Sequence, residues 1–473
     1  MSQQNVASLP AWTIAGHIEP QRGHLAINGV DAIELAKQHD TPLFVFSEPR
    51  ISENIARLKR AAQRASRPIR FCYASKANSL MAVLGVVRDA GIDIEVNSGG
   101  ELYKALRAGF RPDQIVFNGT SKTESEINQA VEAGIYAINV DSIYEIELVL
   151  KSARMLGSRA RIALRLVPEV ETRSHPGLQT ALLTSKFGIS AAEVDTAFSR
   201  ALAHPELVHL CGLHIHVGSQ TPDVEPFARA FEVIWRHLVA VHHATGHMIE
   251  HINLGGGFPV NYLRDRAQAE ALPAHEREMF AADLDPADVV DEVLRVARRE
   301  AEKAQAEHLF DRLTLLFEPG RSIVADAGVL LTAVRNIKRR PETGDTWLLT
   351  DAGFNLLLSM STYHWYYQLI SAARADAPHD APYKVAGPLC DSGDVYFDIE
   401  RQGRLPDYRL LPRDVRPGEL LALLNAGAYT VAQMFPYNGR PLPAVVMVRG
   451  DGRSELIRRR DSYEDLLMNE VWC

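Results

Sequence analysis

The chain has few cysteines, no long apolar run and no excess of positive charge, and each absence excludes a class of protein. The net charge is −8, so we expect no nucleic-acid-binding surface. No apolar run approaches the ~18–20 residues of a membrane span, and residues 1–10 lack the basic and apolar parts of a secretory signal. The four cysteines lack metal or redox spacing, which indicates reduced thiols in the cytoplasm. They are Cys72, Cys211, Cys390 and Cys473.

What the chain does contain is a regular alternation of strand and helix patterns from Arg50 to about Ala327. Eight such units over about 275 residues match an α/β fold of the (β/α)8 barrel type in number and size. A doubly wound sheet is the alternative, but the chain has no Gly-x-Gly-x-x-Gly loop. The candidate strands are Ile69–Tyr73, Ile92–Val96, Ile115–Asn118, Ala137–Val140, Arg161–Leu166, Leu210–His216, Ile249–Leu254 and Thr314–Glu318.

Three domains are predicted from this pattern. Residues 1–48 form a lead-in that contributes to a C-terminal domain, residues 49–327 form the barrel, and residues 328–473 form a β-rich domain of alternating stretches such as TWLLTD. The charge-rich segment 262–294 interrupts the barrel pattern. We interpret it as helical and partly on the surface, either a flap beside the barrel mouth or a solvated insertion without a role in the active site.

Lys76 lies at the end of the stretch FCYASKAN, which is predicted to be a strand that passes into a helix near Ser79. Barrels of this kind build their active sites at the C-terminal ends of the strands. A lysine there with few acidic neighbours in sequence is partly desolvated, which makes its amine a usable nucleophile. The alternative is a lysine that extends from a strand end to water.

Three later motifs also follow predicted strands. In GLHIHVGSQ, His216 can lie flat against a pyridine ring and Ser219 can donate to a phosphate. His214 and His216 could also be a metal pair, but no carboxylate stands close in sequence, so we expect no metal. The glycines Gly255, Gly256 and Gly257 allow close approach to an anion. In EPGR, Glu318 can face a pyridine nitrogen and Arg321 can bind a phosphate or carboxylate, or the two can form an ion pair on a turn.

Two motifs lie in the predicted β-rich domain. GPLCDSGD combines the thiol of Cys390 with carboxylates, among them Asp391, and NAGAY places the phenol of Tyr429 within possible reach of a phosphate. A polar surface turn and a buried structural tyrosine are the respective alternatives. Together with Lys76 and the three strand-end motifs, these parts suit a bound pyridoxal phosphate.

The motifs YASKAN, NSGGEL, SKFGI, GLHIHVGSQ, NLGGGF, EPGR, GPLCDSGD, NAGAY and YNGRP occur in the order of a known family. From about Thr41 to Val448 the chain resembles the fold-type III pyridoxal-phosphate decarboxylases, which include diaminopimelate, ornithine and arginine decarboxylases. The resemblance implies an alanine-racemase-like barrel with a C-terminal β domain. It also implies a homodimer with two shared active sites and an amino-acid substrate.

The resemblance also assigns roles to single residues. Lys76 would hold pyridoxal 5′-phosphate as a Schiff base, and Cys390 of the neighbouring subunit would protonate the carbanion. Asp391 would read the distal end of the substrate. The other cofactor-binding positions would be His216 against the ring, Ser219, Gly255, Gly256, Gly257 and Tyr429 at the phosphate, Glu318 at the pyridine nitrogen, and Gly320 and Arg321 beside them, with Arg321 also binding substrate.

Two positions depart from the diaminopimelate decarboxylase pattern. That subfamily holds the second substrate carboxylate with an arginine four residues before a tyrosine, and here these positions are Ser359 and Tyr363. It also has a glutamate where this chain has Asp391, as ornithine decarboxylases do. Both departures favour a substrate that ends in an amine, such as lysine or ornithine. The resemblance to the diaminopimelate type, which acts on a D-configured centre, implies the D-form, D-lysine or D-ornithine.

Four alternatives stay open at this point. They are a meso-diaminopimelate decarboxylase, a siderophore-pathway decarboxylase, an amino-acid racemase, and a regulatory homologue without turnover. Glu318 argues against the racemase, because alanine racemases place an arginine at the ring nitrogen. Lys76, Glu318 and Cys390 together argue against the regulatory homologue.

Overall fold

The computed structural model describes residues 9–170, 173, 182, 184–265, 270 and 272–471. The chain divides into two compact units. We call the first the barrel unit, which consists of Ser52–Pro259 and Ala282–Ile323. We call the second the β unit, which consists of Met1–Ile51, Val260–Ala281 and Val324–Cys473. No helix in the described ranges is long and apolar enough to cross a membrane.

The barrel unit is built on a closed barrel of eight parallel strands in the order β10-β11-β12-β5-β6-β7-β8-β9. The predicted (β/α)8 architecture is therefore confirmed. Each strand is short and almost entirely buried, as expected for a parallel sheet covered by helices. The strands are β5 (Ile69–Ala74), β6 (Asp93–Val96), β7 (Ile115–Phe117), β8 (Ala137–Val140), β9 (Ala160–Arg165), β10 (Val208–His214), β11 (His251–Asn253) and β12 (Thr314–Phe317).

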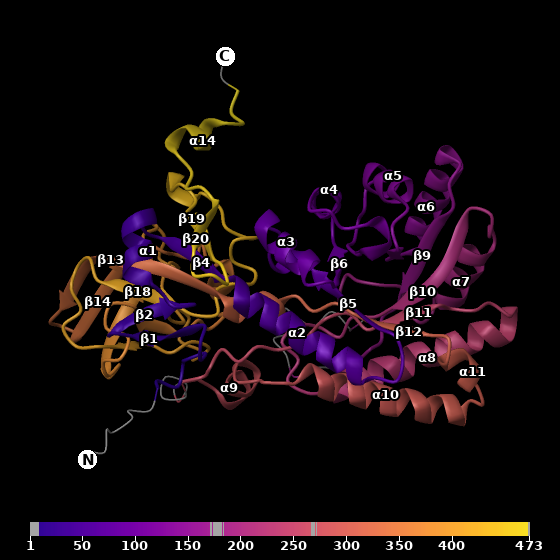
Figure 1. Cartoon of the computed structure of the whole chain (residues 1–473), viewed down its shortest axis with the longest axis horizontal. Helices are drawn as coiled ribbons and strands as arrows, with labels where there is room; N and C mark the ends of the chain where they lie inside the picture. Colours follow the sequence, from indigo (N-terminus) through magenta and orange to yellow (C-terminus); the bar gives the residue numbers. More distant parts are fainter. Residues whose placement is uncertain are drawn as a thin grey trace. The chain divides into compact units, whose positions relative to one another are not determined.

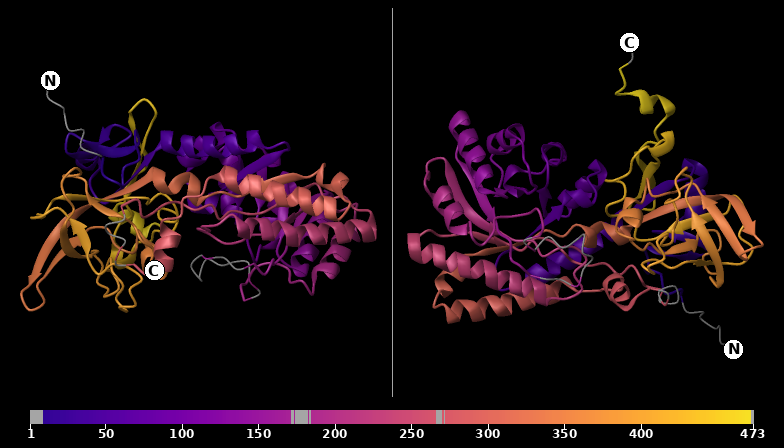
Figure 2. Two further views of the ribbon diagram at one scale, coloured as in Figure 1. Left: turned by 90° about the horizontal axis from the view of Figure 1, so that it is seen from below. Right: turned by 180° about the vertical axis from the view of Figure 1, so that it is seen from behind.

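The helices of this unit follow the strands and have clear end signals. The side chains of Ser98, Thr123 and Ser142 accept a hydrogen bond from the first turn of α4, α5 and α6, respectively. Figures 1 and 2 show the two longest of these helices, α8 and α10, lying side by side. The helices are α2 (Glu48–Arg64), whose first residues belong to the β unit, α3 (Met81–Asp89), α4 (Gly99–Arg107), α5 (Glu124–Ala133), α6 (Ile143–Leu156), α7 (Val194–Leu202), α8 (Glu225–Thr245), α10 (Pro286–Lys303), α11 (Glu307–Phe310) and α12 (Arg321–Val324).

The β unit contains a large mixed sheet in the order β17-β16-β14-β13-β4-β19-β20, with β18 beside β13 and β15 beside β18. Strand β4 (Leu43–Ser47) pairs antiparallel with β13 (Gly328–Arg340) and parallel with β19 (Ala444–Val448). The first segment of the chain therefore lies between two strands from its last segment. The remaining strands are β14 (Asp345–Thr350), β15 (Leu369–Ser371), β16 (Ala381–Ala386), β17 (Arg409–Leu411), β18 (Leu420–Leu423) and β20 (Ser454–Arg458).

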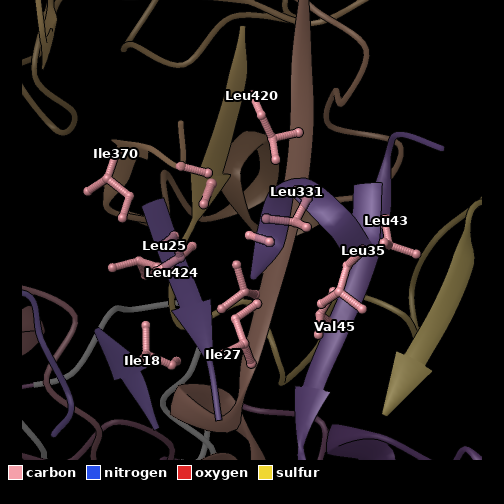
Figure 3. Close-up of a cluster of buried hydrophobic side chains, with 14 of the residues drawn as sticks. Ile18, Leu25, Ile27, Leu35, Leu43, Val45, Leu331, Ile370, Leu420 and Leu424 are labelled. Carbon is pink, nitrogen blue, oxygen red and sulfur yellow. The ribbon is translucent and has the colours of Figure 1, made fainter. Parts of the chain in front are cut away.

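Apolar side chains from both ends of the chain form the core of the β unit (Figure 3). A small sheet of β1 (Ile18–Gln21), β2 (His24–Ile27) and β3 (Val30–Asp31) and the helix α1 (Ala32–His39) contribute Ile27 and Leu35 to it. Burial of these side chains fixes the N-terminal segment in the unit.

Residues Val260–Ala281 belong to the β unit, whereas the prediction made residues 49–327 one continuous barrel domain. Tyr262 and Phe280 are fully buried, and both rings pack edge-to-face against Trp365. These aromatic contacts hold α9 (Ala274–Phe280) in place, so the predicted solvated insertion is wrong for this part. Residues 266–269 and 271 of the predicted insertion lie outside the described residues.

Candidate active site

Lys76 lies in a short 3-10 turn, Ser75–Ala77, directly after β5. The prediction of a helix from Ser79 was two residues early, because α3 begins at Met81. The turn is anchored by a 2.7 Å hydrogen bond from Ser75 Oγ to Glu101. Lys76 itself is half-buried, and its charge acts on the nearby carboxylates of Glu95 and Glu318. The amine therefore lies among buried acids rather than in open water.

Glu318 is the buried carboxylate that follows β12. Its two oxygens accept hydrogen bonds from the side-chain amides of Asn253 and Asn118 at 2.7 and 2.8 Å. Burial opposes its ionisation, but His214 at 3.5 Å and the charge of Lys76 outweigh burial. Burial lowers the pKa of His214 itself, so the fixed positive charge near Glu318 is that of Lys76. The pKa of Glu318 is therefore held below its usual range, and the carboxylate stays ionised.

Glu95, at the end of β6, has the opposite character. It is fully buried, and burial raises the pKa of Glu95 to about 7, with the charge of Lys76 opposing and that of Glu318 adding to the rise. Two acids close to one lysine thus have very different proton affinities. Such separation is typical of catalytic sites.

His216 lies beyond β10, and its ring is held by a backbone contact. Its Nδ1 accepts a hydrogen bond from the backbone N–H of Gly256 at 3.0 Å, so that nitrogen carries no proton. Burial, followed by the charges of Lys76 and Arg165, keeps the pKa of His216 well below its ordinary value. The ring is therefore neutral. Among the described residues, no group of three or more His, Cys, Asp or Glu could hold a metal ion.

The three glycines after β11 form a tight backbone loop. Gly255 and Gly257 have φ values of +67° and +115°, which favour glycine. A Cβ at Gly255 would lie 2.3 Å from His216 Nδ1, and one at Gly256 would lie 2.3 Å from the carbonyl oxygen of Glu318. No side chain fits at these positions, so the backbone lies directly against the loops that carry His216 and Glu318.

Arg321 and Ser219 meet on the same side of the barrel. The Nε and Nη2 atoms of the buried Arg321 lie 3.4 and 3.3 Å from Ser219 Oγ. Gly320 packs closely, because a Cβ there would lie 2.9 Å from the Cβ of Ala74, and its binding of the cofactor stays a prediction. It allows the loop after β12 to approach the turn that carries Lys76.

Cys390 is the one exposed thiol among the described cysteines, since Cys72 and Cys211 are buried. Its loop belongs to the β unit, and the backbone N–H of Cys390 donates to Asn438 Oδ1 at 2.7 Å. Asp394, four residues further along the chain, accepts hydrogen bonds from the backbone N–H groups of Leu389 and Phe354. These bonds anchor the loop that carries Cys390. The thiol is thus exposed on a backbone that is rigidly held.

The predicted specificity residues also lie in the β unit. Ser359, in α13 (Leu358–Thr362), is buried, and its hydroxyl lies 3.4 Å from Oε1 of Gln433. Tyr363 follows α13, and its N–H donates to the carbonyl of Ser359. Asp391 is exposed and accepts a 3.4 Å hydrogen bond from the hydroxyl of Tyr437.

Tyr429 is half-buried and has a φ of 56°, which is uncommon for a residue with a side chain. Nearby Gly427 packs so closely that a Cβ would collide with the carbonyl oxygen of Val324. That Tyr429 and the other β-unit residues complete the barrel site is a prediction from the resemblance.

Comparison with known proteins shows which family this chain belongs to. Residues 52–325 match the model of the pyridoxal-dependent decarboxylase, pyridoxal binding domain. The chain belongs to the pyridoxal-dependent decarboxylase family. It is 34% identical over 445 residues to the diaminopimelate decarboxylase of Archaeoglobus fulgidus, covering 94% of this chain and 96% of that protein.

Solved structures extend the similarity over both units of this decarboxylase. The crystal structure of diaminopimelate decarboxylase from Methanocaldococcus jannaschii matches with a TM-score of 0.83 at 33% identity, covering 96% of this chain and 98% of that one. The same protein in complex with L-lysine matches with a TM-score of 0.83 at 32% identity, covering 97% and 98%. The enzyme is therefore a pyridoxal-phosphate-dependent carboxy-lyase that acts on an amino acid.

The barrel residues of this decarboxylase fit pyridoxal phosphate chemically. The glycine loop excludes side chains where a phosphate needs close backbone N–H groups, and the neutral ring of His216 suits stacking. The ionised Glu318 suits a protonated pyridine nitrogen, and Lys76 is half-buried beside it.

The sequence interpretation missed the residues that support Glu318. Asn118 and Asn253 donate hydrogen bonds to its carboxylate, and His214 contacts it. Besides burial, the negative charge of Glu318 also raises the pKa of Glu95. Asn118, Asn253 and Glu95 are polar residues at the ends of otherwise apolar strands, which was the available signal.

Proposed function

We propose that the barrel residues bind pyridoxal phosphate as the family pattern implies. Lys76 binds it covalently through Nζ, and His216 lies against the ring. The glycine loop, Ser219 and Tyr429 bind the phosphate. When bound, the cofactor accepts the electron pair that the departing carboxylate leaves behind. The observation that supports this best is the buried, ionised Glu318, held by two amide donors.

Glu318 serves the reaction by holding a proton at the pyridine nitrogen. A carboxylate that stays ionised in a buried site is a strong acceptor for that N–H. Asn118 and Asn253 fix its two oxygens, so the carboxylate does not turn away from the ring. Arg321, beside Ser219, binds the phosphate or the substrate carboxylate.

Cys390 serves the reaction by delivering a proton to the α-carbon after carbon dioxide has left. Its exposed thiol and the hydrogen bond from its N–H to Asn438 suit a group that must reach a substrate from one fixed direction. We propose that it acts on the site of a second copy, so that the enzyme is a homodimer with shared sites. The cytoplasmic location stays a prediction.

For the substrate, we propose a diamino acid without a second carboxylate, either lysine or ornithine and preferably the D-form. A distal carboxylate needs a cation, and leaving it without one in a buried site costs several kcal/mol. Ser359 offers a hydroxyl that already lies 3.4 Å from Gln433. Asp391 offers a negative charge, which attracts a terminal ammonium and repels a carboxylate.

meso-Diaminopimelate is the second candidate, and whole-chain similarity favours it. The relatives from Archaeoglobus fulgidus and Bacillus subtilis, each 34% identical over nearly their whole length, are named diaminopimelate decarboxylases. At that identity most positions differ, and the substrate depends on few of them. We therefore give the local chemistry at Ser359 and Asp391 the greater weight.

A substrate screen distinguishes the two candidates. Release of carbon dioxide is measured with meso-diaminopimelate and with both enantiomers of lysine, ornithine and arginine. We expect D-lysine or D-ornithine to give the highest kcat/KM. Efficient turnover of meso-diaminopimelate alone would show that the second candidate is right.

Ser359→Arg tests the same point from within the chain. The added guanidinium should move the preference toward meso-diaminopimelate by about tenfold or more, because it supplies the missing bidentate partner. Ser361→Arg, two residues along α13 on an exposed position, is the matched control and should leave the preference unchanged.

A further inference from the structure

The β unit contains a cavity whose lining includes none of the residues assigned above to cofactor or substrate. It has a volume of about 840 Å³ and is lined by Thr41 and Pro42 before β4, by residues of β13 and β14, by the segments after β14 and β20, and by the loops around Pro388 and Arg440. Three arginines line it, namely Arg335, Arg440 and Arg460, together with the carboxylates of Asp351, Asp461 and Glu464. Asp461 pairs with Arg458, which does not line the cavity. The partners of the three arginines decide what the cavity can bind.

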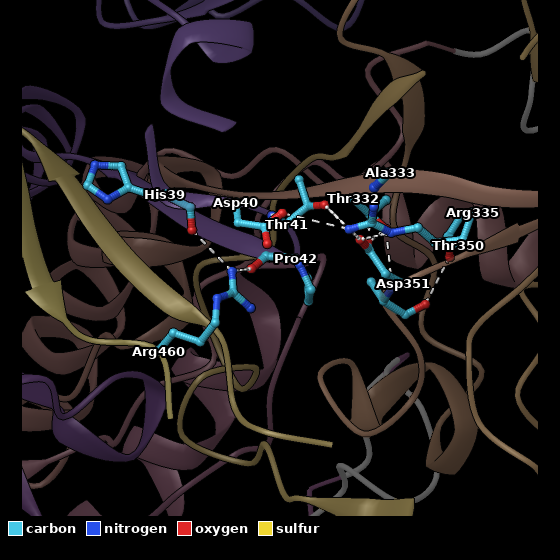
Figure 4. Close-up of polar contacts among 11 residues, drawn as sticks. His39, Asp40, Thr41, Pro42, Thr332, Ala333, Arg335, Thr350, Asp351 and Arg460 are labelled. Atoms are coloured by element: carbon cyan, nitrogen blue, oxygen red, sulfur yellow. Dashed lines mark hydrogen bonds and ion pairs between the residues drawn. The ribbon is translucent and has the colours of Figure 1, made fainter. Parts of the chain in front are cut away.

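Arg335 is neutralised by a carboxylate in the same wall. Its Nε donates to Asp351 Oδ2 at 2.9 Å and its Nη2 donates to Thr41 Oγ1 at 3.0 Å (Figure 4). Asp351 also accepts hydrogen bonds from Thr332 Oγ1 at 2.6 Å and from the N–H of Ala333 at 3.0 Å. The charge of Arg335 is therefore paired with Asp351 within this cluster.

Arg460 and Arg440 differ, because neither forms an ion pair with a carboxylate of the described residues, although the charges of Asp40 and Asp351 act on Arg460. Arg460 donates through Nη2 to the backbone carbonyls of His39 and Pro42 at 3.3 and 2.8 Å (Figure 4). Arg440 donates through Nη2 to the carbonyl of Pro388 at 2.8 Å. A guanidinium has five N–H donors, so each keeps donors on its other two nitrogens.

Other arginines near Arg460 in the sequence do form ion pairs. Arg453, Arg458 and Arg459 each pair with an aspartate of the same segment. The two charges that line the cavity are thus exceptions in a segment that otherwise neutralises its cations.

We propose that this cavity binds a small anion with a carboxylate or phosphate group, held by Arg440 and Arg460. Both groups match a guanidinium in charge and can accept two parallel hydrogen bonds from it. The cavity is large enough for an organic acid as well as for inorganic phosphate.

The site is linked to the segments that carry Cys390 and Ser359, a consequence that rests on the proposed function. Arg440 holds the carbonyl of Pro388, two residues before Cys390. Asn355 lines the cavity four residues before Ser359, and its carbonyl accepts the N–H of Phe435. An anion that draws the Arg440 guanidinium toward the cavity changes the support of the Cys390 loop.

Binding is tested on the holoenzyme by calorimetric titration with inorganic phosphate and, separately, with glutarate. We expect saturable binding of at least one probe, and the tighter probe identifies the preferred head group. Arg440→Gln and Arg460→Gln should each weaken binding about tenfold or more, whereas Arg460→Lys, which keeps the charge, should lose less.

Arg453→Gln is the matched control, because Arg453 pairs with Asp451 and does not line the cavity. It should bind the probe as the unchanged protein does. No saturable binding of either probe up to about 10 mM, or equal binding by Arg440→Gln and Arg460→Gln, would overturn the proposal.

The link to Cys390 has its own readout, which does not depend on turnover. A Cys473→Ser background removes the thiol outside the described residues, and the buried Cys72 and Cys211 react slowly, so a thiol reagent reports on Cys390. The probe should change the modification rate at least about twofold in this background and not in Arg440→Gln. An unchanged rate at saturating probe would separate the binding site from the loop, while leaving the assignment of Cys390 intact.

Discussion

The barrel unit and the β unit contribute functional residues in different physical states. In the barrel, Glu318 and Glu95 are buried and His216 is half-buried, and their protonation is set by desolvation, neighbouring charges and amides. In the β unit, Cys390 and Asp391 are exposed on a loop that is held through its backbone. Under the proposed function, the cofactor is held by residues of the barrel interior, whereas the proton donor Cys390 and the substrate-contacting Asp391 lie on an exposed loop of the β unit.

Lys76→Ala is the strongest test of the barrel side of this comparison. It should abolish both turnover and the visible absorbance of the lysine-bound cofactor, because the variant lacks the amine that we propose binds it. Absorption spectra and carbon dioxide release measure the two effects. Lys151→Ala, an exposed lysine paired with Glu124, is the control. An unchanged spectrum in Lys76→Ala would contradict the assignment.

Cys390→Ala tests the β-unit side and should leave cofactor binding intact. Turnover should fall about 10²–10⁴-fold, because the proton then comes from a less well placed acid. If the thiol serves a second copy, mixing Lys76→Ala with Cys390→Ala should restore part of the activity, since a mixed dimer has one complete site. No recovery under conditions where subunits exchange would place both residues in one chain's site.

Glu318→Gln tests the role of the buried charge in the barrel unit, because glutamine has nearly the same shape as glutamate but no negative charge. The amide cannot hold a proton at the pyridine nitrogen, so kcat should fall about 10²–10³-fold with the cofactor still bound. Asn118→Asp, which replaces a donor to Glu318 with a second charge, should raise the pH at which activity appears. Full activity of Glu318→Gln would show that the carboxylate has only a structural role.

Glu95 gives the smallest effect, on stability. Glu95 has a pKa of about 7 in the folded protein and near 4.5 in the unfolded chain. Between these pH values the folded protein binds more protons, so the free energy of unfolding falls as the pH rises. Glu95→Gln should therefore raise the melting temperature of the cofactor-free protein more at about pH 8 than at about pH 5. Glu95→Asp keeps the charge and is the control. Equal shifts at both pH values would contradict the raised pKa.

Local patterns in the sequence were enough to predict the elements of the barrel. Strand β8 was predicted at its observed bounds, Ala137–Val140, and all four of its residues are buried. Asn118 and Asn253 escaped prediction, because their common partner Glu318 is 200 and 65 residues away along the chain. Only closure of the barrel brings such residues together.

The sequence also did not show that three separate segments of the chain form the β unit, because the contacts that join them link residues far apart in sequence. The charges of residues 262–294 suggested a solvated insertion, and Tyr262 and Phe280 gave no sign of their partner Trp365, which lies far along the sequence. The charge at Arg460 is likewise visible in the sequence, but the sequence does not show that no described carboxylate forms an ion pair with it.

The position of β4 between β13 and β19 also affects how the chain is made. Leu43–Ser47 leaves the ribosome about 280 residues before its first partner strand, which at ~5–20 residues per second is a delay of roughly 15–60 s. All five of its residues are buried in the finished protein, so this strand is an unpaired apolar edge throughout that interval. The whole barrel is synthesised meanwhile. A holding chaperone that covers residues 43–47 during translation would therefore protect this enzyme more than one that acts after release.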